Sequence, residues 1–161
     1  MRNYEFFAAR LEQEIPAFVK VLKAIPPDKF DFRPHEKNTP AGALARQIAT
    51  EIDCLTGLFV NGTADFKSSG GPETLDEIVA MFENGAKSVV ASAKATDENL
   101  WRGPAKFVFD GHLAWEATAA DIAWGFLFDL IHHRGQLSVY LRPMGAKVPA
   151  IYGPSADDPG V

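Results

Sequence analysis

The polar residues of one apolar segment have the types and the spacing that metal or acid–base chemistry needs. Asp129, His133, Gln136 and Tyr140 follow one another at intervals of 4, 3 and 4 residues, so they share one stripe of a helix. Apolar residues continue this stripe toward the N-terminus, which is typical of side chains that face a bundle interior or a pocket. A carboxylate and an imidazole one turn apart can bind one metal ion, or they can form a simple hydrogen bond.

The helix that carries this stripe is expected over residues 118–141, and a second helix over 40–60 is expected to face it. Beside the apolar face of the second helix runs a stripe that includes Gln47, Glu51 and Cys54. This stripe borders the core and is polar at two positions. It is therefore the predicted source of a partner for Asp129 and His133.

The remaining elements follow from helical periodicity and from helix-start and helix-stop signals. Further helices are expected over 4–23, with Pro16 kinking or splitting it, and over 75–97, with Thr74 and Glu77 forming a capping box. Thr39 and Pro40 predict the start of the second helix. Residues 25–34 contain adjacent prolines and predict an extended connector.

Residues 99–115 predict a long irregular connector before the last helix, with a short extended pair around 106–109 and a turn at Asp110 and Gly111. Aromatic residues in this connector are expected to shape an apolar opening, a weak indication of a small-molecule site. Residues 143–161 predict an extended C-terminal tail. The predicted fold class is all-α, a four-helix bundle in a single domain over 1–161.

Composition limits the function classes. The chain has 161 residues, of which 47% are hydrophobic, and a net charge of -5 with dispersed basic residues, which argues against a nucleic-acid partner. The apolar stretch 122–131 lies between Asp121 and Asp129 and is too short to span a bilayer. Cys54 is the only cysteine, so an internal disulfide is excluded. The N-terminus does not have the pattern of a signal peptide, and we expect a cytoplasmic protein without membrane contact.

Several sequence motifs resemble the DinB-like (DinB/YfiT) family of helical proteins. The motif on the last helix is His-His-Arg-Gly-Gln-Leu at 132–137 with Tyr-Leu-Arg at 140–142, followed by Gly-Ala-Lys-Val-Pro-Ala-Ile-Tyr-Gly-Pro at 145–154. The connector at 25–34 and the start of the second helix at 44–48 are also similar. The resemblance covers nearly the whole chain. It implies a four-helix bundle, often dimeric, with a divalent metal held by three histidines.

In that family one histidine comes from the second helix and two come from the last, four residues apart. Some relatives are transferases or isomerases that use a low-molecular-weight thiol. In this chain the three positions fall on Gln47, Asp129 and His133, so two imidazoles are replaced. Such a set is harder and closer to what iron, manganese or magnesium accept than to zinc or nickel. The site has changed its metal, lost it, or recruited Glu51, which lies one turn beyond Gln47.

The candidate metal ligands are therefore Gln47, Asp129 and His133, with Glu51 as the substitute, and the candidate metals are Ni, Zn, Fe or Mn. Cys54, Gln136 and Tyr140 are the candidates for lining a pocket. These residues also have structural interpretations, because Gln136 and Tyr140 could hydrogen-bond across the bundle. Cys54 is interpreted as a small buried apolar group, since the charge of Glu51 would raise the thiol pKa and disfavour a nucleophile.

Other residues of the last helix receive structural interpretations. His132 points about 100° away from His133 and is expected to cap a polar network or to lie at a subunit contact. Arg134 is expected to pair with an acid on a neighbouring helix. The sequence identifies no catalytic residue.

Two hypotheses about function follow. The first is a metal-dependent small-molecule enzyme that resembles the thiol-dependent transferases and isomerases of the family, with an altered metal site and a low-molecular-weight thiol as cosubstrate. The alternative is a metal-free ligand-binding or protein-interaction module on the same bundle. In both cases the expected partners are a small molecule and a second copy of the chain, in a homodimer.

Overall fold

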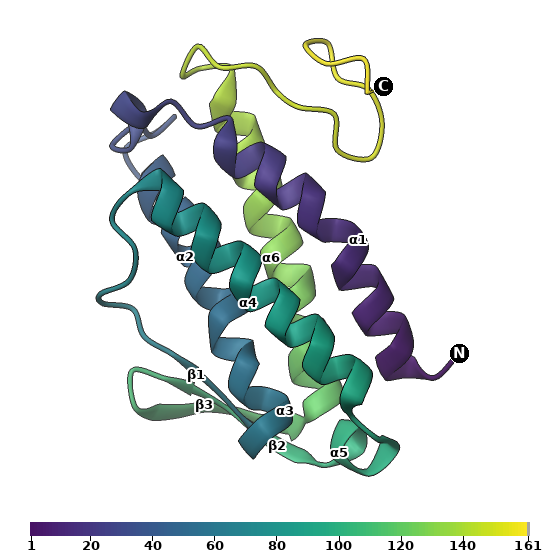
Figure 1. Cartoon of the computed structure of the whole chain (residues 1–161). Coiled ribbons are helices and arrows are strands. Elements are labelled where there is room, and N and C mark those ends of the chain that lie inside the picture. Colours follow the sequence, from purple (N-terminus) through teal and green to yellow (C-terminus); the bar gives the residue numbers. More distant parts are fainter. Residues whose placement is uncertain (161) are drawn as a thin grey trace.

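Four long helices dominate the computed structural model, which describes residues 1–160. They pack side by side along their length (Figure 1). The long helices are α1 (Asn3–Lys23), α2 (Ala41–Cys54), α4 (Leu75–Ala95) and α6 (Ala119–Leu141). The short helical elements are η1 (Pro27–Lys29), η2 (Leu55–Gly57), α3 (Leu58–Asn61) and α5 (Glu98–Arg102), and the strands are β1 (Thr63–Phe66), β2 (Pro104–Phe109) and β3 (His112–Thr118).

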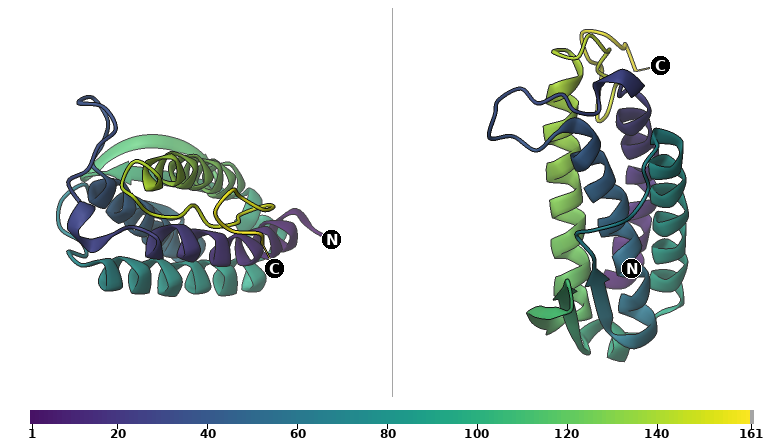
Figure 2. Two further views of the ribbon diagram at one scale, coloured as in Figure 1. Left: turned by 90° about the horizontal axis from the view of Figure 1, so that it is seen from above. Right: turned by 90° about the vertical axis from the view of Figure 1, so that its left-hand side faces the viewer.

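The long helices are arranged so that α4 and α6 each contact both α1 and α2. Figure 2 shows α4 in teal and α6 in green on opposite sides of these two helices. The apolar faces predicted from the sequence meet in the middle, where Phe7, Phe18, Ile48 and Phe82 are each 0% exposed. Burial of such side chains is the main favourable term in folding. The mutual packing of α1, α2, α4 and α6 therefore forms the frame on which the short helices and the strands lie.

The capping box predicted at Thr74 is confirmed, and a second capping box, which was not predicted, begins α6. Thr74 accepts a hydrogen bond from the backbone N–H of Glu77, and Thr118 accepts one from that of Asp121. In both cases the acidic side chain closes the capping box and satisfies a backbone donor that the helix leaves free. The second helix begins one residue later than expected, with Pro40 as its N-cap.

Two expectations about helix continuity were wrong. Of the two alternatives given for Pro16, a split of the first helix is wrong, because α1 runs without a break from Asn3 to Lys23. The helix expected over 40–60 is instead interrupted by η2. A Cβ atom at Gly57 would lie 2.6 Å from the carbonyl oxygen of Thr63, so only glycine allows the chain to turn back here so closely.

The prediction of an all-α fold was also wrong, because the chain forms a three-stranded sheet in the order β1-β2-β3. The antiparallel β2–β3 hairpin closes through Asp110 and Gly111, which have φ of 49° and 84°. Two successive positive φ angles are typical of a tight hairpin turn. The two strands are also longer than the extended pair expected near 106–109. Strand β1 pairs in parallel with β2, some 40 residues further along the chain, and no local pattern could show this pairing.

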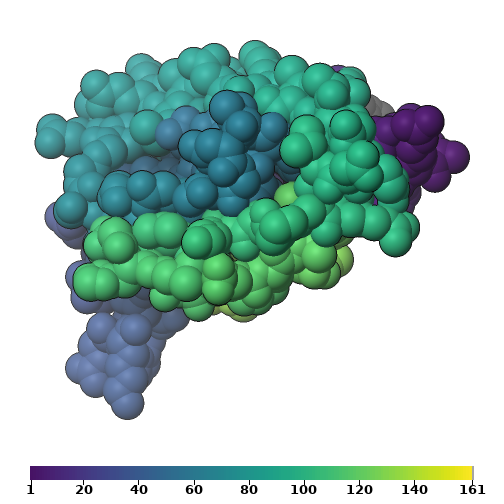
Figure 3. Space-filling model, turned by 90° about the horizontal axis from the view of Figure 1, so that it is seen from below, coloured from purple at the N-terminus to yellow at the C-terminus, as the bar shows by residue number. Residues whose placement is uncertain are grey.

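The sheet lies at the end of the molecule where α6 begins (Figure 1). Figure 3 shows the hairpin in green beside the segment of α3 and β1, which together cover that end. Within the part of the chain that the structure describes, no helix is both long enough and apolar enough to cross a membrane.

At the opposite end, the C-terminal tail lies over α1 and α6 without regular secondary structure (Figure 1). The tail is attached to a buried ion pair that joins two long helices. Arg134 on α6 and Glu14 on α1 form this pair at 2.6 Å, which confirms the expectation for Arg134. The hydroxyl of Tyr152 in the tail donates to the same carboxylate at 2.9 Å. Tyr152 therefore ties the tail to the long helices.

Replacing Glu14 by Ala should destabilise the fold by about 3 kcal/mol, since it leaves the Arg134 guanidinium buried without its counter-charge. The measurement is urea unfolding followed by circular dichroism. The matched control is Glu12→Ala on the same helix, because Glu12 pairs with Lys94 in solvent and is 57% exposed. The control should cost less than about 1 kcal/mol, and equal losses in the two variants would contradict the role given to Glu14.

Candidate metal centre

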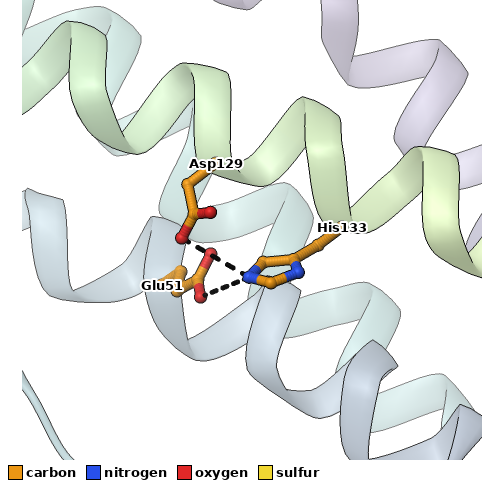
Figure 4. Close-up of side chains that lie close together, drawn as sticks. All are labelled: Glu51, Asp129 and His133. Atoms are coloured by element: carbon orange, nitrogen blue, oxygen red, sulfur yellow. Dashed lines mark ion pairs between the residues drawn. The ribbon is translucent and has the colours of Figure 1, made fainter. Parts of the chain in front are cut away.

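Four polar side chains from α2 and α6 meet at the contact between these helices. Glu51 and Gln47 are one turn apart on α2, and Asp129 and His133 are one turn apart on α6. Figure 4 shows Asp129, His133 and Glu51 pointing toward one another across the helix contact. The side chains of Glu51 and His133 are 5% and 14% exposed, whereas that of Asp129 is 54% exposed. The group is therefore buried on one side and open to solvent on the other.

The imidazole lies between the two carboxylates. Its Nε2 atom is 3.3 Å from Oε1 of Glu51 and 3.4 Å from Oδ2 of Asp129. One ligand atom of each of these three residues lies within 4.8 Å of the other two. Two ligands of a tetrahedral ion with bonds of about 2.1 Å are separated by about 3.4 Å, so the spacing is suited to one ion with small adjustments.

Gln47 contacts two members of the group. Its Nε2 atom donates to Oε1 of Glu51 at 2.7 Å and lies 2.9 Å from Nε2 of His133. An amide N–H can only donate, so the second contact is a hydrogen bond only when Nε2 of His133 carries a lone pair, and in the imidazolium form the Gln47 amide has to turn its oxygen toward the ring. Gln47 would become a ligand only after its amide turns by 180°, which would direct its oxygen toward the group.

Gln136 contacts the other face of the same imidazole. Its Oε1 atom lies 3.0 Å from Nδ1 of His133 and can accept a hydrogen bond from it. A proton held on Nδ1 leaves the lone pair of Nε2 directed at Glu51 and Asp129. This arrangement is typical of histidines that bind metals, in which the second ring nitrogen donates to a fixed acceptor.

Without a metal, a proton takes the position between the imidazole and the carboxylates. The hydrogen bond with Glu51 raises the pKa of His133 to about 9, although burial opposes the rise. The hydrogen bond with Gln136 and the negative charges of Glu51 and Asp129 add to this effect. His133 is therefore an imidazolium at neutral pH unless a cation displaces its proton.

One oxygen of the group has no partner. Oε2 of Glu51 is buried and accepts no hydrogen bond from any of the described residues. Leaving a buried polar atom unsatisfied costs about 1–3 kcal/mol, and more when the group is charged. A bound cation would supply the missing interaction, so this carboxylate has the surroundings expected of a metal ligand.

A cavity of about 660 Å³ opens beside the group, and Gln47, Glu51 and Asp129 form part of its wall. None of the three residues predicted to line a pocket is among the described lining residues of this cavity, and Gln136 contacts His133 instead. Cys54 borders a different, smaller cavity, and Tyr140 is buried with its ring against Phe32.

The structure brings together all the residues predicted as ligands, and it gives Glu51 a larger part than the sequence did. The carboxylate of Glu51 contacts His133 directly, whereas Gln47 presents an amide nitrogen. Among the other residues of α6, His132 lines the cavity and Gln136 positions the ring of His133. The supporting role of Gln136 was not predicted, although its spacing of three residues from His133 is the signal that could have shown it.

Comparisons with known proteins agree with this architecture. The sequence profile of the DinB family matches residues 3–159, and the chain therefore belongs to the DinB family. No curated protein sequence matches the chain.

Two similar solved structures are DinB-like proteins. One is from Bacillus subtilis, with 19% identity and a TM-score of 0.68 over 86% of this chain and 92% of the other. The second is from Bacillus cereus, with 16% identity and a TM-score of 0.70 over 91% of this chain and 95% of the other. A mycothiol-dependent maleylpyruvate isomerase is similar with 13% identity and a TM-score of 0.52, over 89% of this chain and 61% of the isomerase. At these identities the similarity establishes a common fold.

The raised pKa of His133 predicts how stability depends on pH in protein treated with a chelator. The charged imidazole stabilises the folded state fully below pH 6.5, the ordinary pKa of histidine, and this contribution is lost as the pH rises through about 9. The free energy of unfolding, measured by urea titration between pH 6.5 and 9.5, should fall more steeply in the wild type than in His133→Gln. His112→Gln, at an exposed position on β3, is the control and should keep the wild-type slope. Equal slopes for wild type and His133→Gln would contradict the assignment.

The thiol of Cys54 should be unreactive in the folded protein. Burial raises the pKa of Cys54 well above its ordinary range, and the charges of Glu51, Asp53 and Asp65 raise it further. Because the thiolate is the reactive form, alkylation by iodoacetamide at pH 8 should be at least about 100-fold slower in the native protein than in urea. Mass spectrometry of the labelled protein over time measures both rates. Similar rates in the two states would restore Cys54 as a candidate nucleophile.

Proposed function

We propose that the protein is a metal-dependent enzyme for a small molecule, in which Glu51, Asp129 and His133 hold one divalent ion. The convergence of three ligand atoms from two helices within 4.8 Å is the observation that supports this most strongly. The buried, unpartnered oxygen of Glu51 provides independent support. Two carboxylates and a neutral imidazole would balance the charge of the ion, so the loaded site would carry no net charge.

The donor set narrows the choice of metal. Carboxylate oxygens are hard ligands, so two of them with one imidazole favour iron or manganese, with magnesium as a weaker candidate, over nickel or zinc. Gln47 adds an amide oxygen to the set if its side chain turns. Three protein ligands leave coordination positions open, which is typical of catalytic sites.

A bound divalent ion would supply Lewis acidity, which lowers the pKa of a thiol or water molecule that it binds. The residues of the chain have separate tasks around it. Glu51 is buried and fixes the inner side of the site, while Asp129 is exposed and stands at the cavity. Gln136 holds the ring of His133 in the orientation that directs Nε2 inward.

A low-molecular-weight thiol is the cosubstrate that we propose, by analogy with the mycothiol-dependent isomerase that has a similar fold. The reaction class is accordingly a thiol-dependent transfer or isomerisation. A homodimer and a cytoplasmic location remain predictions from the resemblance and from the composition.

A metal-free ligand-binding or interaction module is the second candidate, and one observation favours it. The ion pair between His133 and Glu51, together with the amide of Gln47, compensates much of the buried charge without a metal. In that case the cavity would bind its ligand without chemistry at the carboxylates.

Metal binding separates the two candidates. Protein purified without a nickel column should contain a transition metal by elemental analysis, or added Mn²⁺ or Fe²⁺ should raise its melting temperature. Glu51→Gln and His133→Gln should each weaken metal affinity by at least about 100-fold, since each removes a ligand and the charge or lone pair it supplies. Asp129→Asn should have a smaller effect, because solvent screens this exposed carboxylate.

Asp53→Asn is the matched control, since it removes a carboxylate from the same helix without touching the group, and it should bind metal like the wild type. A metal content below about a tenth of an equivalent, with a melting temperature that no divalent ion changes, would reject the enzyme proposal and leave the second candidate.

A further inference from the structure

The cavity beside the carboxylates is lined mainly by aromatic rings. These rings come from all three strands and from α6, so the wall exists only because the sheet closes this end of the helices. The aromatic lining residues are Phe66, Phe107, Phe109, Trp115, Phe126 and Phe128. The volume of about 660 Å³ is within the range of about 300–1,000 Å³ that is usual for small-molecule sites.

Several of these rings contact one another or the backbone of α6. Phe66 and Phe109 stack with centroids 5.4 Å apart, and Phe107 meets Phe126 edge-on at 4.9 Å. Trp115 packs against the backbone of α6 at Gly125, where a Cβ atom would lie only 3.2 Å from the indole ring. The absence of a side chain at Gly125 thus lets the ring of Trp115 lie against the helix.

Several of these rings remain in contact with solvent. Phe109 is 43% exposed, Trp115 is 41% exposed and Phe128 is 64% exposed. Exposed aromatic rings grouped around one cavity are unfavourable in water and are typical of a ligand site. Further flat apolar surface placed between them would be buried on more than one side.

The ionisable side chains of the cavity restrict the charge of its ligand. They are Glu51, Asp129 and His132, and neither lysine nor arginine occurs among the described lining residues. A neighbouring cavity of about 320 Å³ has the opposite character, since Arg46 and Lys67 contribute to its wall. An anionic group would therefore be repelled from the aromatic cavity.

We propose that the aromatic cavity binds a planar aromatic group without negative charge, as the unreactive part of the substrate. The head group of that substrate would point toward Glu51 and Asp129, which stand in the same wall. The description of this ligand as a substrate depends on the proposed function, whereas binding of the ring depends only on the cavity. The two ideas can therefore fail separately.

The test compares two probes with the same ring and different charge, 2-naphthalenemethanol and 2-naphthalenesulfonate. Each is titrated into chelator-treated protein and into protein supplied with Mn²⁺ or Zn²⁺, with binding followed by calorimetry, and, in the chelated or Zn²⁺-loaded samples, also by NMR chemical shifts. In chelator-treated protein the neutral probe should bind at least about tenfold more tightly than the sulfonate, because only the sulfonate brings a negative charge to two carboxylates that no cation neutralises. Binding should persist in chelated protein.

Two variants test the location of binding. Trp115→Ala and Phe128→Ala should each weaken binding of the neutral probe by at least about fivefold, since each removes a ring from the wall. Phe6→Ala is the matched control, because Phe6 is an aromatic residue with 45% exposure that lies outside the cavity, and it should bind like the wild type. Melting temperatures confirm that each variant is folded, and Phe128 is exposed enough for its truncation to be tolerated.

The proposal is overturned if the wild type binds neither probe, if chelator-treated protein binds both equally, or if Trp115→Ala and Phe128→Ala are both without effect. It is also overturned if light scattering shows that these two substitutions dissociate a dimer, because the rings then serve a contact between subunits. Binding of the neutral probe by protein that takes up no metal would support the cavity proposal and reject the metal-dependent enzyme.

Discussion

The contact between α2 and α6 is the constraint on which the site depends, because it brings two acids and one imidazole into a partly buried space. The side chain of Glu51 is only 5% exposed, so its charge is poorly hydrated and must be balanced by a proton on His133 or by a cation. The proton and the cation would both bind to the same lone pair, on Nε2 of His133. A proton and a metal ion would therefore be alternatives at one position, because the packing of α2 and α6 leaves room for only one of them beside Nε2.

The sheet contributes to the same end of the molecule in a different way. It covers the start of α6 with strand residues, and these residues form the aromatic side of the cavity whose polar side comes from α2 and α6. A bundle of helices alone would leave Asp129 on an open surface. With the sheet in place, the carboxylate stands at the boundary between an apolar space and the metal centre, where a ligand can contact both.

Local sequence patterns predicted what local physics determines. The apolar faces of four helices, the capping box at Thr74, and the spacing of Asp129 and His133 all act within a few residues of one another. The parallel pairing of β1 with β2 escaped prediction because its partners are distant in sequence. The break at Gly57 depends on the carbonyl of Thr63 and the loop that carries it, so a helical pattern alone could not reveal it.

The side of α6 that faces away from the metal centre is fixed by the ion pair between Arg134 and Glu14, with Tyr152 completing the hydrogen bonds. Arg134 follows directly after His133, so the same helical turn is held from two directions. Rotation of α6 about its own axis would break a buried charge pair. The backbone of α6 can therefore keep one position when the side chains at 47, 51 and 129 are substituted, so the set of donor atoms at this contact can change without a change of fold.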